Sequence, residues 1–201
     1  IAIVPISGGS NINLMRAESP GPSVGKLVPK VKHTARILYI IYLGLSLIEF
    51  IILLLAKMPV FDAMNTTFGT AGTGGFGIKN SSLGGYSVTI QWIVTVFMIL
   101  FGVNFNAYYL MLFGSIKKAL TMEEVRAYFG IILTSIVIIT INIYSMCSSV
   151  WDAITKSAFQ VGSIITTTGF STIDFNLWPQ TSKTILVLLM FVGACAGSTG
   201  G

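Results

Sequence analysis

The chain has 201 residues, of which 53% are hydrophobic and only 9% are charged, and its mean hydropathy is +0.82. Soluble domains carry about 25% charged residues, so this composition excludes an ordinary water-soluble globule, a disordered tail and a coiled coil. It indicates an all-α protein embedded in a membrane. The net charge of +5 would favour nucleic-acid binding only if the basic residues shared a soluble face. Glycine is frequent, at 21 residues.

The ends of the chain and its reactive side chains restrict the function classes further. The chain starts at Ile1 without a signal-peptide pattern and stops within an apolar stretch, so we expect a fragment of a longer membrane protein. Cys147 and Cys195 form neither a disulfide framework nor a zinc-binding spacing, and His33 is the single histidine. We therefore expect no enzyme, no cofactor and no histidine-based metal site in this segment.

Four apolar segments each approach the length of about 20 residues that a helix needs to cross a bilayer. The first contains one charged residue, Glu49, which either serves the function or pairs with a neighbour as a structural contact. Asn104 and Asn142 are expected to form hydrogen bonds between helices, and residues 1–6 read as the end of an earlier span. The four segments are residues 37–56, 88–113, 127–147 and 184–201.

Basic residues gather in two of the connecting segments. Residues 7–36 and 114–126 hold eight of the twelve lysines and arginines, whereas residues 57–87 and 148–183 hold four. The positive-inside rule places the two basic segments in the cytoplasm. We therefore read the basic residues as a topology signal of a multi-pass cell-membrane protein in contact with lipid, and not as a nucleic-acid site.

The two outer loops repeat one another. Thirteen residues separate Asp62 from Gly75 in the first loop, and 17 separate Asp152 from Gly169 in the second. The extra four residues are about one helical turn, so the second loop is expected to carry the longer re-entrant helix. The matching pieces are residues 61–63 (FDA) and 73–77 (TGGFG) in the first loop and 151–153 (WDA) and 167–171 (TTGFS) in the second. The chain thus reads as repeated units of span, re-entrant loop and span.

Each outer loop starts with an aspartate, Asp62 or Asp152. Aspartate is a good N-cap, so each predicts a following helix of about 8–12 residues, which is too short to span a bilayer. The C-terminal end of such a helix would point a partial negative charge inward and favour a cation. The two aspartates are helix caps alone on one interpretation, and on another they also attract ions at a pore mouth.

The glycine-containing pentapeptides predict a selectivity filter. Irregular backbone at membrane depth survives only where it is buried in protein or lines an aqueous path. Potassium filters replace the water of the ion with backbone carbonyl groups, and glycine permits the backbone angles that turn successive carbonyls toward one axis. The aromatic residue can wedge each loop against its neighbours. The predicted filter residues, which bind potassium through backbone carbonyls, are Thr73, Gly74, Gly75, Phe76, Thr167, Thr168, Gly169 and Phe170.

Other motifs in the chain lack the context that their chemistry needs. Residues 72–77 fit G-x-G-x-x-G, but a dinucleotide site requires a preceding strand and a crossover helix. Residues 197–199 resemble the end of a phosphate loop without its lysine, and a nucleophilic Ser198 would need a base. Two alternatives to a pore remain: a membrane-embedded enzyme that uses Ser198 or Glu49, and a non-channel secondary cation transporter with broken helices.

Several motifs of the chain resemble the Trk/Ktr/HKT superfamily of potassium transporters, and within it the TrkH-like membrane subunits. They are RAESPGP at 16–22, the two Asp–Ala…Gly–Phe loops, GVNF at 102–105 and GACAGSTGG at 193–201, in the order of the family. The resemblance implies four fused span–loop–span units in a fourfold pseudosymmetric, potassium-channel-like pore. Residues 1–33 then form the end of a preceding unit and a basic linker, residues 34–116 a pore unit, and residues 117–201 a second, truncated unit.

The resemblance also implies roles for the glycines. A central glycine, here Gly75 and Gly169, goes with potassium selectivity, and a glycine-rich intramembrane loop beneath the filter acts as a gate. Glycine weakens a helix by about 1 kcal/mol relative to alanine, but Gly193 and Gly197 could instead form a G-x-x-x-G helix contact. The implied gate residues are Gly193, Gly197, Ser198, Thr199, Gly200 and Gly201. Potassium uptake, a homodimer and a cytoplasmic nucleotide-binding regulatory subunit are implied in the same way.

Overall fold

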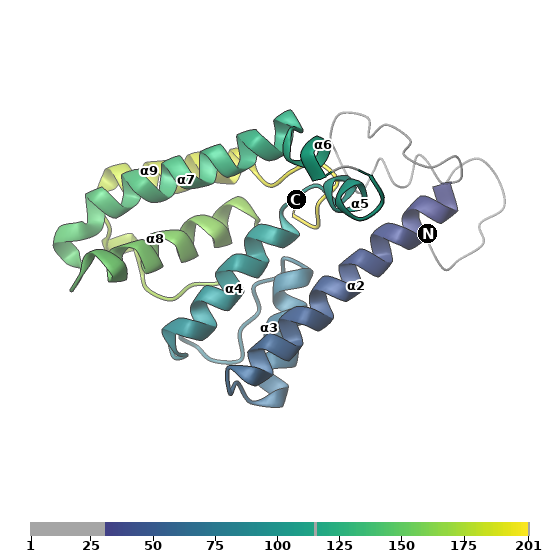
Figure 1. Cartoon of the computed structure of the whole chain (residues 1–201). Coiled ribbons are helices and arrows are strands. Elements are labelled where there is room, and N and C mark those ends of the chain that lie inside the picture. The colour runs from purple at the N-terminus through teal and green to yellow at the C-terminus, as the bar shows by residue number, and fades with distance from the viewer. Residues whose placement is uncertain (1–30, 115, 201) are drawn as a thin grey trace.

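The computed structural model describes residues 31–114 and 116–200, and every regular element in these ranges is a helix. Two groups of helices lie one after the other along the chain, joined by the short helix α6 (Ile116–Leu120) (Figure 1). The RAESPGP motif, most of the basic segment 7–36 and the gate residue Gly201 lie outside the described residues.

The first group begins with α2 (Val31–Leu55), a long apolar helix of 25 residues. The chain then turns at Lys57, which has a φ of 64°, into α3 (Val60–Ala71), which packs against α2. The 12 residues of α3 reach only about 18 Å, which is too short to cross a bilayer. Helix α4 (Val88–Phe101) comes next, and its N-cap Ser87 accepts a hydrogen bond from the amide of Ile90 at 3.4 Å.

The apolar segment 88–113 is broken, although the sequence predicts one continuous span there. Helix α5 (Phe105–Phe113) leaves α4 at an angle of 87°. Asn104 caps α5, because its side-chain oxygen accepts a hydrogen bond from the amide of Asn106 at 2.9 Å. The Tyr108 hydroxyl donates to the carbonyl oxygen of Leu100 at 2.7 Å. The Asn104 cap and the hydrogen bond of Tyr108 thus hold the bend, and a hydropathy pattern shows neither of them.

The second group repeats the order of the first. It contains α7 (Glu123–Ile143), a 3₁₀ turn η1 (Tyr144–Met146), α8 (Val150–Ile165), a second turn η2 (Phe175–Leu177) and α9 (Gln180–Val192). Helix α3 has 12 residues, within the predicted 8–12, and α8 has 16. The second helix is therefore the longer one, as expected, but it exceeds the predicted length. The groups meet where α4 packs against α8; there the indole of Trp92 donates to the Thr155 hydroxyl at 3.1 Å.

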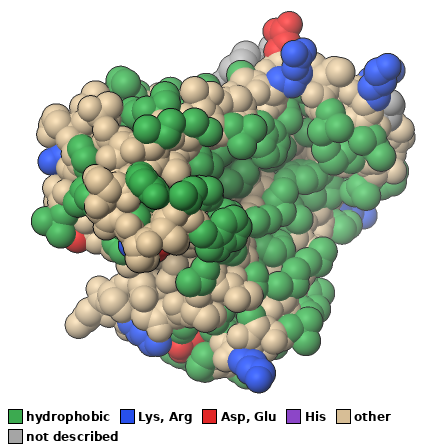
Figure 2. All heavy atoms as spheres, turned by 60° about the vertical axis from the view of Figure 1, so that its left-hand side comes forward, with side chains coloured by type: hydrophobic (Ala, Val, Ile, Leu, Met, Phe, Trp, Pro, Cys, Tyr) green, Lys and Arg blue, Asp and Glu red, His purple; other side chains and the backbone are tan. Residues whose placement is uncertain are grey.

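The surface of the described helices suits a membrane. Ala35–Leu55 and Glu123–Met146 are long and apolar enough to cross one, and the bent pair α4–α5 is a third candidate if it counts as one span. Hydrophobic side chains cover much of the face in Figure 2, and charged side chains lie toward its rim. Exposed apolar side chains continue along α2, α7 and α9, which is expected of helices that face lipid or neighbouring membrane helices.

Candidate functional site

The two predicted filter loops begin where α3 and α8 end, and their backbones take the same path. In the first loop, Thr73 and Gly75 have φ angles of 48° and 63°; in the second, Thr167 and Gly169 have φ angles of 58° and 87°. The residue between each pair keeps a negative φ. A left-handed threonine is uncommon, so its recurrence at the equivalent position shows that one unusual backbone conformation is built twice.

The amide groups of both loops bond back to the helices that precede them. The amides of Gly74 and Gly75 donate to the carbonyl oxygen of Gly69 in α3, at 2.8 and 3.3 Å. The equivalent amides of the second loop donate to the carbonyl oxygen of Ser163 in α8, at 2.9 and 3.3 Å. Each loop is therefore fixed to the C-terminal end of a short, re-entrant helix by the same pair of bonds.

These bonds set the direction of the loop carbonyl groups. A trans peptide holds its C=O opposite its N–H, so the carbonyls of Thr73 and Gly74, and of Thr167 and Thr168, point away from the helices. Within the described ranges, no hydrogen bond reaches the carbonyl oxygens of Thr73, Gly74 or Thr168. The helix C-terminus adds a partial negative charge of about half an electron. Such an arrangement suits a cation that has lost water.

The two loops lie against each other. A Cβ atom at Gly75 would lie 3.0 Å from the carbonyl carbon of Thr168 and closer still to its oxygen. Beyond the loops, the amide of Leu83 donates to the carbonyl oxygen of Ser171 at 3.0 Å, and the amide of Ser171 donates to the Ser82 hydroxyl at 3.2 Å. The structure thus brings the two sets of predicted filter residues together at one place.

The aromatic residues of the two loops have different surroundings. Phe170 is 1% exposed, and its ring packs so closely on α3 that a Cβ at Gly69 would lie 2.8 Å from the Phe170 Cζ. Phe76 is 79% exposed in the described part of the chain. The aromatic wedge that the sequence predicts is therefore formed by Phe170, and Phe76 lacks an equivalent neighbour among the described residues.

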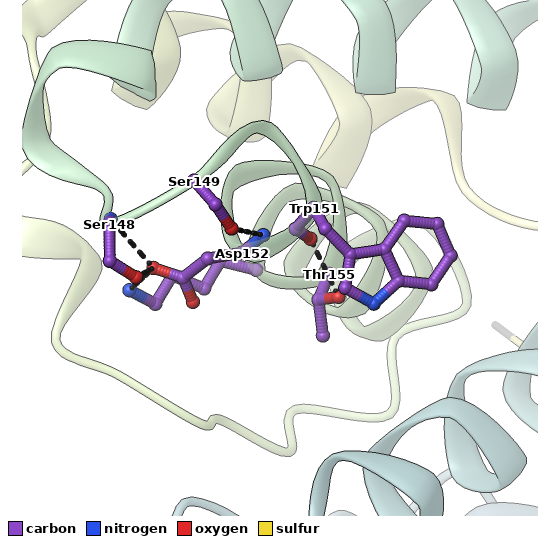
Figure 3. A network of polar contacts seen from close by, with 6 residues as sticks. Ser148, Ser149, Trp151, Asp152 and Thr155 are labelled. Atoms are coloured by element: carbon purple, nitrogen blue, oxygen red, sulfur yellow. Dashed lines mark hydrogen bonds and ion pairs between the residues drawn. The ribbon is translucent and has the colours of Figure 1, made fainter.

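Neither Asp62 nor Asp152 is an N-cap, so that prediction is wrong. Both are the third residue of their helices, and Ser149 caps α8 by accepting the Asp152 amide at 3.1 Å (Figure 3). The Asp152 carboxylate accepts from the Ser148 amide at 3.2 Å and pairs with Lys156 at 2.7 Å. The hydrogen bond from Lys156, assisted by Ser148, holds the pKa of Asp152 below its ordinary value because it favours the charged form.

Asp62 has a different partner, which ties the start of α3 to the segment after its filter loop. The Tyr86 hydroxyl donates to the Asp62 carboxylate at 2.6 Å, and the Lys79 ammonium lies 3.9 Å from the centre of the Tyr86 ring. Burial and the bond to Asp62 raise the pKa of Tyr86 to about 12, so the hydroxyl keeps its proton at neutral pH. Both aspartates therefore have structural partners, and attraction of ions by them stays a prediction.

After α9, the glycine-rich segment (residues 193–200) returns to the break between α4 and α5. Its turns use Gly193 and Gly197, with φ angles of 69° and 76°. The Cys195 amide donates to the carbonyl oxygen of Gly102 at 3.0 Å, and the Phe105 amide donates to that of Gly197 at 3.1 Å. Because neither glycine of the G-x-x-x-G pattern is inside a helix, the interpretation as a helix–helix contact is wrong.

The same segment reaches the first filter loop and the C-cap of α8. The Thr199 amide and hydroxyl donate to the carbonyl oxygen of Phe101 at 3.3 and 3.2 Å. The Thr199 carbonyl oxygen accepts a bond from the Thr73 hydroxyl at 3.2 Å. A Cβ at Gly200 would lie 3.0 Å from the carbonyl oxygen of Thr166, the C-cap of α8. The glycine-rich segment therefore lies directly against the ends of both re-entrant helices, where the filter loops begin.

Sequence reasoning missed Glu124 in the first turn of α7. Its carboxylate accepts hydrogen bonds from the side-chain amide of Asn104, at 2.9 Å, and from the backbone amide of Ala196. Asn104 belongs to the break between α4 and α5, and Ala196 to the glycine-rich segment. Ala196 is 72 positions away from Glu124 in the chain, so no local pattern could have revealed the contact.

Two other polar residues within apolar segments have contrasting environments. Asn142 accepts a hydrogen bond from the Ser182 hydroxyl at 2.7 Å, which confirms the expected bond between helices, here α7 and α9. Glu49 is fully buried beside Thr70, whose hydroxyl donates to the carbonyl oxygen of Thr66 at 2.8 Å. Its carboxyl oxygens have no hydrogen-bond partner in the described ranges. These ranges also contain no group of three His, Cys, Asp or Glu residues that could hold a metal.

Comparisons with known proteins agree on one family. A model of the TrkH family, described as a cation transport protein, matches residues 1–201. The chain belongs to the TrkH family. Over its whole length it is 36% identical to the Trk system potassium uptake protein TrkH of Salmonella typhimurium, 34% to that of Vibrio parahaemolyticus and 30% to the Trk system potassium uptake protein TrkG of Escherichia coli. It spans 43%, 43% and 42% of these relatives.

A solved structure supports the same conclusion. The crystal structure of the potassium transporter TrkH from Vibrio parahaemolyticus matches with a TM-score of 0.82 and 33% sequence identity. The match covers 94% of this chain and 42% of that one. The repeated all-α architecture predicted from the sequence is therefore that of a TrkH protein, and the family and the apolar helices together place the chain in a membrane.

Proposed function

We propose that this chain is part of a potassium uptake pore whose selectivity filter is lined by backbone carbonyl groups. The observation that carries the proposal is the paired geometry of the loops, in which left-handed residues recur at equivalent positions and the amides turn toward the helices. Potassium is supported as the ion because the relatives are named Trk system potassium uptake proteins.

In this pore, the carbonyl groups of the two loops replace part of the water shell of potassium. The C-terminal ends of α3 and α8 add partial negative charge, and binding has to be strong enough for entry yet weak enough for release. Potassium is the transported substrate, and we assign no cofactor. The proposed filter consists of Thr73, Gly74, Gly75 and Phe76 together with Thr167, Thr168, Gly169 and Phe170.

The two loops supply half of a fourfold ring. This proposal is supported by length, because the chain spans 43% of its TrkH relatives. It is also supported by Phe76: since its equivalent Phe170 packs on the re-entrant helix of the neighbouring unit, the exposed Phe76 needs a further unit to pack against. We keep residues 34–116 and 117–201 as the two pore units and residues 1–33 as the end of a preceding one.

The glycine-rich segment is the proposed gate, formed by Gly193, Gly197, Ser198, Thr199, Gly200 and Gly201. Its contacts with Thr73 and Thr166 support this role, because a segment at the start of the filter loops lies in the way of an ion that leaves them. Glycines in left-handed conformations give the segment the backbone freedom that movement requires.

The proposed membrane topology is supported by the distribution of basic residues, and the proposed partners are supported by the family resemblance. The basic segments 7–36 and 114–126 support a multi-pass arrangement with both of them in the cytoplasm. A homodimer and a cytoplasmic nucleotide-binding regulatory subunit are carried by the resemblance to the Trk/Ktr/HKT superfamily alone. Lipid surrounds the apolar helices, and the proposal assigns no role to nucleic acid or to catalysis.

One structural feature also fits the alternative of a secondary transporter with broken helices. The segment 88–113 breaks between α4 and α5, as a broken span would. The paired loops favour the pore, because two short re-entrant helices with identical loop bonds have no part in that alternative.

Rubidium uptake by the full-length gene product, expressed in bacteria that lack their own potassium uptake, tests the proposed function. Gly75→Asp and Gly169→Asp each introduce a side chain into a filter loop, and we expect both to abolish uptake or its preference over sodium. Gly130→Ala in α7 is the matched control, because its Cβ would meet nothing within 4 Å. Unchanged uptake and selectivity in both aspartate variants, at equal amounts of membrane protein, would overturn the proposal.

A further inference from the structure

We propose that Glu124 is a positioning residue that anchors the glycine-rich segment against the filter loops. This inference rests on the proposed function and adds the anchor of the proposed gate. Glu124 is the second residue of α7 and is partly buried. Its two carboxylate oxygens accept one bond each, from the side chain of Asn104 and from the backbone amide of Ala196. One side chain thus joins α7 to two separate breaks in helical structure.

The two donors require a carboxylate. The Asn104 side-chain oxygen already accepts the Asn106 amide at 2.9 Å, so its NH₂ group is the part that faces Glu124. The Ala196 amide is a second donor from another direction. A carboxylate offers acceptor oxygens on both sides, whereas glutamine offers one oxygen and would turn its own NH₂ group toward a donor. The negative charge also strengthens both bonds.

The position of the anchor relates it to the proposed gate. Ala196 lies between Cys195, which bonds to Gly102, and Gly197, which accepts the Phe105 amide. Thr199, three residues further along, bonds to Thr73 at the start of the first filter loop. The residues on either side of Ala196 are held by backbone hydrogen bonds. Among the described residues, Glu124 is the one charged side chain that bonds to this part of the glycine-rich segment. Its loss is expected to loosen the segment at the filter.

The test uses three variants of the full-length gene product in proteoliposomes. Glu124→Gln removes one acceptor, and Glu124→Ala removes both. Glu123→Gln is the matched control, because Glu123 is adjacent, exposed and without an ion pair in the described part of the chain. The first measurement is the hydrogen–deuterium exchange of the backbone amides in residues 193–200, detected by peptide mass spectrometry. These amides include those of Cys195 and Thr199, which bond to the end of α4, and this measurement needs no ion transport. The second is rubidium flux.

We expect the amides of residues 193–200 to exchange about tenfold faster in Glu124→Gln, the effect of losing one hydrogen bond to a charged group. Exchange is faster again in Glu124→Ala, rubidium flux rises in both, and Glu123→Gln matches the wild type. Equal exchange rates in Glu124→Gln and Glu123→Gln would overturn the anchor, as would faster exchange with unchanged flux. If the wild type carries no rubidium, the proposed function fails, whereas the exchange rates still decide whether Glu124 holds the segment.

Discussion

Alanine at the two central glycines tests the paired loops, because the same substitution meets different surroundings at equivalent positions. Both glycines are left-handed, with φ angles of 63° and 87°, and a side chain there costs about 1–2 kcal/mol. At Gly75 the new Cβ would also lie 3.0 Å from the Thr168 carbonyl carbon, whereas ordinary contact begins at 3.4 Å; at Gly169 it would meet nothing within 4 Å. Only Gly75→Ala therefore forces the Thr168 carbonyl to move, by about 0.4 Å or more.

Displacement of that carbonyl should change ion coordination as well as stability. Overpacking adds about 1–3 kcal/mol, and about 1.4 kcal/mol corresponds to a factor of ten. We expect Gly75→Ala to lower the ratio of rubidium to sodium uptake about tenfold or more, and Gly169→Ala to lower it by a clearly smaller factor. Both ions are measured in the same proteoliposomes, with Gly44→Ala in α2 as the control because its Cβ has open space. Equal losses at the two positions would refute the reasoning.

Three further predictions concern contacts around the loops. Gly69→Ala would place a Cβ 2.8 Å from the Phe170 ring and should lower the free energy of unfolding by about 1–3 kcal/mol. Adding Phe170→Leu in the same chain should restore part of that free energy. If the double variant instead loses the sum of the two single-variant losses, this contact is contradicted. Tyr86→Phe removes the 2.6 Å bond to Asp62 and should cost about 1 kcal/mol, which thermal unfolding in detergent would detect; an unchanged midpoint would argue against the bond. Asp152→Asn removes the pair with Lys156, whose side chains are 29% and 27% exposed, so the loss should not exceed about 0.5 kcal/mol. Because the pKa of Asp152 is lowered on folding, the stability that its carboxylate contributes is complete above the ordinary pKa of 3.8 and disappears as the pH falls through the pKa of the folded state. If wild type and Asp152→Asn still differed in stability after full protonation of Asp152, the assignment of the effect to its charge would be contradicted.

Two of the four predicted spans, the two re-entrant helices and the left-handed glycines could be predicted from the sequence because each obeys a local rule, whereas residues 88–113 are broken and the helix in 184–201 ends at Val192. Hydropathy predicts α2 and α7. The spacing from Asp to Gly predicts that α8 exceeds α3 by four residues, since one whole helical turn can be added while the direction of the next loop is kept. Glycine predicts the left-handed positions at Gly75 and Gly169, although the left-handed threonines beside them carry no such signal.

Most other features depend on partners that are distant in the chain, so the sequence could not show them. Residues 88–113 contain no charged residue and read as one apolar segment, whereas the bend between α4 and α5 is held by the Asn104 cap and by bonds from Cys195 and Thr199. The cap of α8 is a local exception: Ser149 and Asp152 are both good caps in the same short stretch, and only the structure distinguishes them. Phe170 packs on α3 of the other group of helices, whereas the described residues contain no equivalent neighbour for Phe76, which a further unit would supply in the proposed fourfold ring.

The break between α4 and α5 and the glycine-rich segment satisfy each other's backbone hydrogen bonds. This sets a condition on opening the proposed gate. Thr199 and Cys195 donate to the carbonyl oxygens of Phe101 and Gly102, at the end of α4. If the glycine-rich segment moves away, these donors and acceptors lose their partners, and each unsatisfied buried group costs about 1–3 kcal/mol. Opening is therefore feasible only if water or the ion reaches the same groups as the segment leaves. A gate built from irregular backbone next to a filter thus couples its movement to the hydration of the pathway.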